Sequence, residues 1–193
     1  YRYTSKGNLV AVINDGTAVL GLGNTGALAG KTVMEGKAVL FKRFEEVDVF
    51  DIEVDSEKPD DIIYTLDRIA RAFGGINLED IAAPHCFYIE EELKRRLDIP
   101  VFLDDMLGSD IIFEAGILNS LELKEKTLAD AKSVLLGAGA GGLGSMYLLM
   151  EMGAQRDNIY MVDRQGIMHH KRENLTPTKQ AFVINTEKRT LAD

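Results

Sequence analysis

The sequence predicts an α/β protein whose strands are mostly parallel. Short apolar runs that fit strands alternate with longer segments whose apolar residues recur every three or four positions, as in amphipathic helices. The expected strands cover 8–13, 47–54, 76–78, 100–103, 133–136 and 158–162, and the expected helices cover 33–44, 59–73, 86–97, 109–121 and 145–152. This alternation is typical of consecutive βαβ units, in which each helix connects two parallel strands.

The first strand is expected to form a hairpin instead of leading into a helix. Asn14-Asp15-Gly16 separates the apolar runs 8–13 and 17–22, and Asp-Gly between such runs is a strong hairpin signal. Four glycines follow between Gly21 and Gly30, which predicts a loop with unusual backbone angles or a close approach to a ligand.

The composition excludes several classes of protein. The chain has 193 residues, of which 46% are hydrophobic, enough to bury a core. Its net charge of −9 argues against a dominant nucleic-acid role, because phosphate binding needs a concentrated positive surface. No apolar run approaches the roughly 20 residues that cross a bilayer, so we expect no membrane span and a cytoplasmic location. The single cysteine, Cys86, is interpreted as a structural residue.

A glycine motif follows the expected strand at 133–136. Gly137, Gly139 and Gly142 are spaced as G-x-G-x-x-G, directly between an apolar run and a helical segment. In dinucleotide-binding folds these glycines allow the tight turn, the approach of backbone to the pyrophosphate and the close packing of helix on strand. The alternative is a glycine-rich turn in some other βαβ unit, but the order of strand, glycines, helix and acid favours a cofactor site.

The acid in that order is Asp163, which ends the next apolar run. It follows the glycine motif at the expected distance of about 20 residues. A carboxylate there binds the ribose hydroxyls of NAD and repels the 2′-phosphate of NADP. Arg164 follows immediately and could accommodate that phosphate. The sequence therefore favours NAD and leaves NADP possible.

Two acidic pairs follow short apolar runs. Glu79-Asp80 comes after one expected strand and Asp104-Asp105 after the next, so in a parallel sheet both pairs reach the same carboxyl edge. Hard cations such as Mg²⁺ and Mn²⁺ prefer carboxylate oxygens, and Glu79, Asp80 and Asp105 are the candidate ligands. The alternative is that these acids cap helices or lie in solvated turns.

The remaining polar candidates carry less information. Lys37 lies among apolar residues of an expected helix, and a partly buried lysine can act as a base. The alternative for Lys37 is an exposed side chain whose stem covers apolar surface. His169 and His170 show no metal-ligand spacing and are expected to be exposed.

Several segments match one known family in the same order along the chain. They are Tyr-Thr-Ser-Lys-Gly-Asn at 3–8, Asp-Gly-Thr-Ala-Val-Leu-Gly-Leu-Gly-Asn at 15–24, Val-Met-Glu-Gly-Lys at 33–37, and further segments at 73–81, 99–105 and 137–142. Together these segments resemble the malic enzymes, in particular their shorter bacterial-type class, over nearly the whole chain. The resemblance implies a malic-enzyme-type N-terminal α/β domain over 1–125 and a partial Rossmann (doubly wound) domain over 126–193, which looks incomplete.

The resemblance also implies an activity: oxidative decarboxylation of L-malate to pyruvate and CO₂ with reduction of NAD or NADP. It identifies Lys37 as the general base and Glu79, Asp80 and Asp105 as ligands of Mg²⁺ or Mn²⁺. The implied partners are the small-molecule substrate and further copies of the chain, in a dimer or tetramer.

The chain departs from the family pattern in one segment. After the second acidic pair the family usually reads close to Gln-His-Gly-Thr-Ala, whereas here Met106-Leu107-Gly108-Ser109-Asp110 follows. This favours a second hypothesis, a non-catalytic relative or fragment that binds a nucleotide or acts in assembly. A different NAD-linked dehydrogenase with two domains is a third interpretation, but such enzymes do not need the paired carboxylates.

Overall fold

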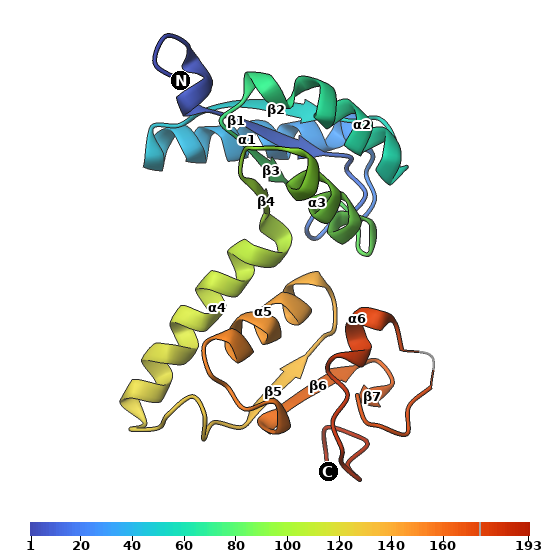
Figure 1. Ribbon diagram of the computed structural model, residues 1–193. Helices are drawn as coiled ribbons and strands as arrows, with labels where there is room; N and C mark the ends of the chain where they lie inside the picture. The colour runs from blue at the N-terminus through green and yellow to red at the C-terminus, as the bar shows by residue number, and fades with distance from the viewer. Residues whose placement is uncertain (174) are drawn as a thin grey trace. The chain divides into compact units, whose positions relative to one another are not determined.

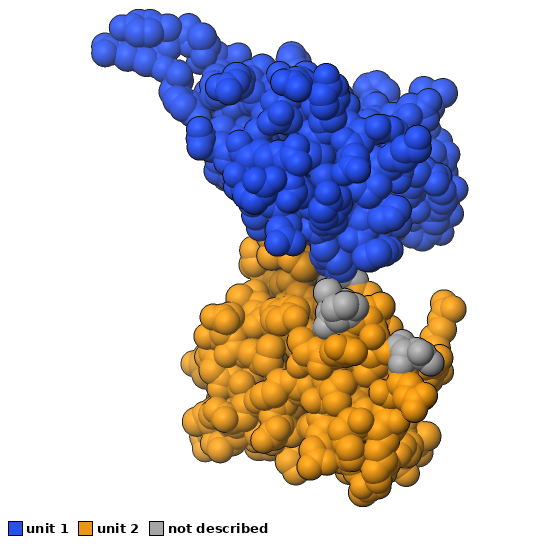
Figure 2. All heavy atoms as spheres, turned by 45° about the vertical axis from the view of Figure 1, so that its right-hand side comes forward, with its two compact units in different colours: residues 1–105 blue, residues 106–193 orange. Residues whose placement is uncertain are grey.

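The computed structural model describes residues 1–173 and 175–193 and divides into two compact units, 1–105 and 106–193 (Figure 2). Along the chain, the boundary between the units falls inside helix α4 (Asp104–Leu123), about 20 residues before the predicted boundary at 125/126. The reason lies in the packing of α4, because Asp110 on this helix accepts a hydrogen bond from Ser145 in the second unit. The predicted domain assignment itself stays a prediction.

The first unit is built on a four-stranded parallel sheet with the order β2-β1-β3-β4 (Figure 1). Its strands are β1 (Leu9–Asn14), β2 (Asp48–Glu53), β3 (Gly75–Leu78) and β4 (Val101–Leu103). Its helices are α1 (Ala27–Glu45), α2 (Pro59–Ile69) and α3 (His85–Arg96), with short 3₁₀ turns at Ser5–Asn8 and Ala70–Ala72. Strands β1 and β3 are central and most of their side chains are buried, which confirms the predicted parallel α/β arrangement.

The connections that leave β1 and β3 run toward opposite edges of the sheet. Helix α1 leads from β1 to the edge strand β2, whereas α3 leads from β3 to the opposite edge strand β4. Because parallel crossovers are right-handed, α1 covers one face of the sheet, and α2 and α3, which pack against each other, cover the other face. Ligands of open α/β sheets bind where the connections diverge in this way, at the carboxyl ends of the strands.

The predicted hairpin at Asn14-Asp15-Gly16 is wrong. Strand β1 has β2 on one side and β3 on the other, so no edge is free to pair with residues 17–22. Asp15 instead accepts hydrogen bonds from the backbone N–H and the hydroxyl of Thr17, and the chain turns into a loop. Gly16 fits this turn because its φ is +70° and a Cβ there would collide with the carbonyl group of Gly26.

Helices α1 and α4 each begin several residues earlier than predicted. Helix α1 begins at Ala27 and not at 33, directly after Gly26, whose φ of +77° ends the glycine loop. Helix α4 begins at Asp104 and not at 109, so Asp104 and Asp105 form its first turn. Acidic side chains in the first turn of a helix are stabilised by its unpaired N–H groups and its dipole.

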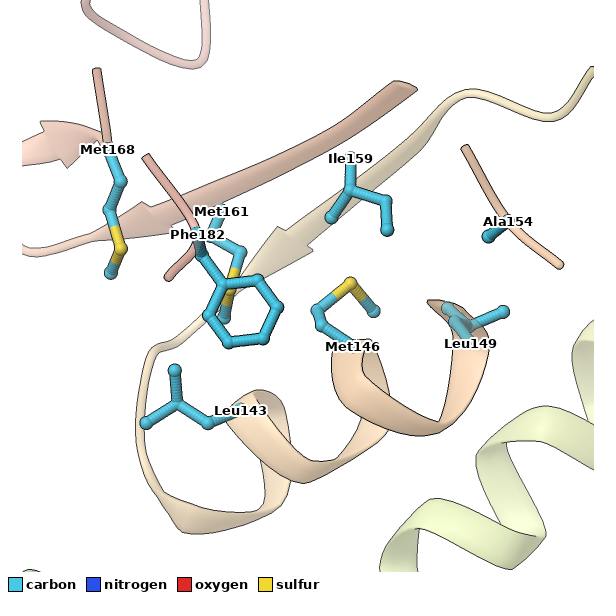
Figure 3. Packing of buried hydrophobic residues seen from close by; sticks show 8 residues of the cluster. All are labelled: Leu143, Met146, Leu149, Ala154, Ile159, Met161, Met168 and Phe182. Carbon is cyan, nitrogen blue, oxygen red and sulfur yellow. The ribbon is translucent and has the colours of Figure 1, made fainter. Parts of the chain in front are cut away.

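The second unit contains the short sheet β5-β6-β7. Strands β5 (Ser133–Leu136) and β6 (Ile159–Asp163) are parallel, and β7 (Gly166–Ile167) pairs with β6 in the antiparallel sense. Helix α5 (Ala140–Glu151) connects β5 and β6, with a 3₁₀ turn at Arg156–Asn158, and the short helix α6 (Pro177–Gln180) follows. Figure 3 shows a hydrophobic core cluster of the second unit, made of Leu143, Met146, Leu149, Ala154, Ile159, Met161, Met168 and Phe182.

Among the described residues, no helix is both long enough and apolar enough to cross a membrane.

Helix α4 contacts α5 through Asp110, and a second buried acid, Glu114, follows one turn later on α4. Asp110 and Glu114 are 1% and 3% exposed, and a Cβ on Gly144 of α5 would collide with the Asp110 carboxylate. Burial raises the pKa of Asp110 to about 6, and burial together with the nearby Asp110 raises the pKa of Glu114 to about 7. Both Glu114 carboxylate oxygens have no hydrogen-bond partner within the described part of the chain.

Glu114→Gln is expected to flatten the decline in stability between pH 5 and pH 8. The folded-state pKa of Glu114 lies above its unfolded value, so its contribution is present below the unfolded pKa and is lost as the pH rises through about 7. Removing the ionisation should raise the free energy of unfolding at pH 8 by on the order of 2 kcal/mol. Urea unfolding at pH 5 and pH 8 measures this, with Glu122→Gln on the exposed face of α4 as control. An unchanged pH slope in the Glu114→Gln variant would contradict it.

Candidate metal centre and cofactor pocket

Three carboxylates converge at the carboxyl edge of the first sheet. Glu79 and Asp80 follow β3, and Asp105 lies in the first turn of α4 directly after β4. One carboxylate oxygen from each of the three lies within 4.8 Å of the others. Glu79 and Asp80 are buried and Asp105 is half-buried. The carboxyl ends of the neighbouring parallel strands β3 and β4 therefore bring together the three residues that the sequence analysis named as metal ligands.

The backbone around Asp80 orients this cluster. The N–H of Glu79 donates to the carbonyl of Ile13 over 2.8 Å, which ties the end of β3 to β1. The N–H of Asp80 donates to a carboxylate oxygen of Asp105 over 3.0 Å. Asp80 itself has a φ of +53°, an unfavourable conformation for a residue with a Cβ. The local structure thus holds the side chains of Asp80 and Asp105 close together despite their like charge.

The electrostatics of the cluster fit a divalent cation. Burial and the neighbouring Asp80 raise the pKa of Asp105 to about 6, and burial and the neighbouring Asp104 raise the pKa of Glu79 to about 8. Oxygen Oδ2 of Asp80 is buried and has no hydrogen-bond partner among the described residues. Crowded carboxylates with an unsatisfied oxygen are the donor set that Mg²⁺ or Mn²⁺ prefers.

Lys37 points from α1 into the same group of acids. Its Nζ lies 2.6 Å from a carboxylate oxygen of Glu79 and also forms an ion pair with Asp104. Burial alone would lower the pKa of Lys37, but its hydrogen bonds to Asp104 and Glu79 outweigh this and raise the pKa. The side chain is 29% exposed, so Lys37 is not the solvent-exposed lysine of the alternative interpretation.

A cavity of about 360 Å³ opens beside Lys37 and Asp104. The side chains of Phe41 and Phe102 line it together with residues from β3 and the start of β4. A small organic molecule in this cavity could contact the Lys37 amine. The first unit thus combines a carboxylate cluster, the Lys37 ammonium group that contacts it and a cavity that reaches Lys37 and Asp104.

The glycine motif in the second unit forms a tight turn between β5 and α5. Gly137 follows β5 with a φ of +112°, which residues with a Cβ rarely adopt. A Cβ on Gly142 would collide with the carbonyl oxygen of Gly137, so α5 could not pack this close to the turn. A Cβ on Gly139 would meet nothing within 4 Å, so packing does not explain that glycine. Helix α5 begins at Ala140, and its first N–H groups follow the turn.

A cavity of about 580 Å³ lies between this turn and the end of β6. Gly137 lines one side, and Asp163 and Arg164 line the other. Two cationic residues that the sequence analysis did not name, Arg172 and Lys179, also line the cavity. They come from the irregular segment after β7 and from α6, where no fixed spacing in the sequence marks them.

Asp163 is held by these two cations. The guanidinium of Arg172 donates to both carboxylate oxygens over 2.9 and 3.0 Å, and Nζ of Lys179 donates to Oδ2 over 3.1 Å. Burial alone would raise the pKa of Asp163, but these bonds and that from the Gln165 N–H hold the pKa well below its usual range. Asp163 is therefore a half-buried anion with its cationic partners already in place.

Burial decides two other interpretations of the sequence. His169 is 8% exposed, which contradicts the prediction, because residue 169 forms a β-bridge with Ile184. His170 is exposed, as predicted. Cys86 is fully buried, and burial raises the pKa of its thiol to about 11, which agrees with its interpretation as a structural residue.

Comparison with known proteins identifies both parts of the chain. The family model "Malic enzyme, N-terminal domain" matches residues 2–59, and "Malic enzyme, NAD binding domain" matches residues 106–192. An NADP-dependent malic enzyme of Halomonas elongata is 55% identical over all of this chain, which spans 46% of that protein. The chain belongs to the malic enzyme family. This confirms the resemblance to malic enzymes that the sequence segments indicated. It also confirms the predicted fold, an N-terminal α/β domain followed by a partial Rossmann domain.

Other malic enzymes support the fold and leave the nucleotide open. The crystal structure of the malic enzyme from Pyrococcus horikoshii superimposes with a TM-score of 0.91 at 45% identity, covering 96% of this chain and 44% of that one. An NAD-dependent malic enzyme of Rhizobium meliloti is 50% identical over 99% of this chain, which covers 25% of its length. The chain thus spans between a quarter and half of these relatives, and the family binds a nicotinamide dinucleotide that is NADP in some members and NAD in others.

Proposed function

We propose that this chain carries the general base, the metal ligands and a nucleotide-binding turn of a malic enzyme. The reaction is the oxidative decarboxylation of L-malate to pyruvate and CO₂, with hydride transfer to a nicotinamide dinucleotide. The observation that carries the proposal is the contact of Lys37 with Glu79, because it joins a candidate base to the candidate metal ligands. Membership of the family supports the same chemistry.

Each residue has a definite part in this proposal. Glu79, Asp80 and Asp105 would bind Mg²⁺ or Mn²⁺, which as a Lewis acid stabilises negative charge on the substrate's C2 oxygen. Lys37 would accept the proton of the C2 hydroxyl as the hydride leaves C2. Engagement of Glu79 in metal binding would remove one of the two anionic partners of Lys37, and so favour the neutral amine that a base requires.

The test is the formation of reduced nucleotide on addition of L-malate to the purified protein, with and without Mn²⁺. We expect turnover that depends on the metal. Nucleotide binding without turnover would favour the second hypothesis, a nucleotide-binding relative without activity, to which the departures between Met106 and Asp110 point. The dimeric or tetrameric assembly and the cytoplasmic location stay predictions.

We further propose that the nucleotide is NADP, although Asp163 led the sequence analysis to favour NAD. A carboxylate can accept about four hydrogen bonds through its two oxygens. Asp163 already accepts four, from the N–H of Gln165, from both Nη atoms of Arg172 and from Nζ of Lys179. No lone pair is left for the ribose hydroxyls whose recognition would select NAD.

The charge of the cavity supports the same choice. Arg164, Arg172 and Lys179 line it together with the single carboxylate of Asp163, so the polar lining has a net positive charge. A 2′-phosphate carries negative charge and accepts hydrogen bonds from guanidinium and ammonium groups. In this proposal Asp163 orients Arg172 and Lys179 and does not contact the ribose itself.

Lys179→Ala is expected to weaken NADP⁺ binding by about 10- to 100-fold, the effect of losing one charge-assisted hydrogen bond. Binding of NAD⁺ should stay the same or tighten, because one lone pair of Asp163 becomes available. Calorimetric titration with both nucleotides measures this. The control is Lys171→Ala, which removes an exposed lysine that pairs with Glu187 outside the cavity lining. Tighter binding of NAD⁺ than of NADP⁺ by the unmodified protein would contradict the proposed preference.

A further inference from the structure

The loop after β1 lies against the segment that carries Asp80. The N–H of Ala18 donates to the carbonyl of Asp80 over 2.9 Å. The N–H of Ala82 donates to the hydroxyl oxygen of Thr17 over 2.8 Å. Two consecutive residues of the loop, Thr17 and Ala18, therefore bind the backbone of Ala82 and Asp80.

We propose that Thr17 is a positioning residue that holds the backbone of residues 80–82 so that the Asp80 carboxylate faces Glu79 and Asp105. The proposal rests on the metal site of the proposed function. It assigns a role to a side chain that neither contacts the cation nor belongs to the acidic cluster.

The Thr17 hydroxyl is itself fixed in direction. It donates to Oδ1 of Asp15 over 2.6 Å, and the N–H of Thr17 donates to the same oxygen over 2.9 Å. Its proton is thus committed to Asp15, which leaves an oxygen lone pair for the N–H of Ala82. Asp15 is 4% exposed, so the carboxylate that fixes the Thr17 hydroxyl is shielded from competing water.

The conformation of Asp80 explains why such a support is needed. With a φ of +53° Asp80 is in the left-handed region, which is less stable than the right-handed region for a residue with a Cβ. Hydrogen bonds hold its N–H, through Asp105, and its carbonyl, through Ala18. The bond from Ala82 to Thr17 fixes the direction in which the chain continues. Without it the backbone can relax and turn the Asp80 carboxylate away from the cluster.

The test uses Thr17→Val, which keeps the shape of the side chain and removes the hydroxyl, and Thr17→Ser, which keeps the hydroxyl. Thr65→Val is the matched control, because Thr65 donates to the Asp61 carbonyl within α2 and is remote from the acidic cluster in the chain. Calorimetric titration with Mn²⁺ alone gives the dissociation constant of each variant, and thermal unfolding without metal gives its stability.

We expect Thr17→Val to weaken Mn²⁺ binding by about 10- to 100-fold, as loss of a residue supporting a metal ligand does. Thr17→Ser should restore the affinity to within a few-fold, and Thr65→Val should leave it unchanged. Unchanged Mn²⁺ affinity in Thr17→Val would overturn the positioning role, and so would equal weakening in the Thr17→Ser variant. Failure of the unmodified protein to bind Mn²⁺ would instead overturn the proposed metal site.

Discussion

Replacement of Lys37 by alanine is expected to lower kcat for malate oxidation by about 10²- to 10⁴-fold, the usual contribution of a general base. The amine is the basic group in contact with Glu79 in this structure, so water would have to accept the proton of the C2 hydroxyl in the variant. Steady-state formation of reduced nucleotide at saturating malate and Mn²⁺ measures the effect. Nucleotide binding should be unchanged, because the glycine motif proposed to bind it lies in the second unit.

Lys31→Ala is the matched control for Lys37→Ala. Lys31 lies on the same helix and also forms ion pairs, among them those with Asp51 at 2.6 Å and Glu53 at 3.6 Å. These acids belong to β2 and not to the cluster of Glu79, Asp80 and Asp105. A loss of activity in the Lys31 variant as large as in the Lys37 variant would show that the effect is structural. Retention of full kcat in Lys37→Ala would exclude Lys37 as the base.

Asp105→Asn is expected to weaken Mn²⁺ binding by more than about 100-fold and to abolish metal-dependent turnover at ordinary Mn²⁺ concentrations. The substitution keeps an oxygen that can accept the hydrogen bond from the Asp80 N–H, so the backbone of the site should remain in place. It removes the negative charge that the site provides for the cation. Stability should stay the same or increase, because the like charge facing Asp80 is gone.

The measurement for Asp105→Asn is calorimetric titration with Mn²⁺, followed by the activity assay over a range of metal concentrations. Asp48→Asn is a suitable control, because Asp48 is an exposed carboxylate at the amino end of β2, the opposite end of the sheet from the cluster. Equal Mn²⁺ affinity in Asp105→Asn and the unmodified protein would remove Asp105 from the ligand set.

The local sequence was sufficient to predict most of the helices and strands and the residues that make up the candidate site. Alternating apolar runs predicted the strands and the helices between them, because burial of apolar side chains has a period that the sequence carries. The acids after β3 and β4 could be placed together because parallel strands end at one edge. The glycine motif could be recognised because the positive φ of Gly137 and the tight packing at Gly142 exclude side chains.

Pairing partners and long-range contacts depended on the tertiary structure. Asp-Gly after β1 has the chemistry of a hairpin turn, but β2 and β3 occupy both edges of β1, so the same residues lead into the loop that binds the backbone near Asp80. Asp163 has the position of a ribose-binding acid, but Arg172 and Lys179 take up its lone pairs.

By itself, then, the sequence determined the α/β class, the family, the glycine turn and which acids meet at the sheet edge, since each depends on local pattern or on strand direction. Only the tertiary structure decided that Lys37 contacts Glu79 and that Thr17 binds the backbone after Asp80. It also decided that the side chains of Arg172 and Lys179 bind Asp163. These contacts join residues that are separated in the chain, and their formation depends on side-chain geometry that no local spacing encodes.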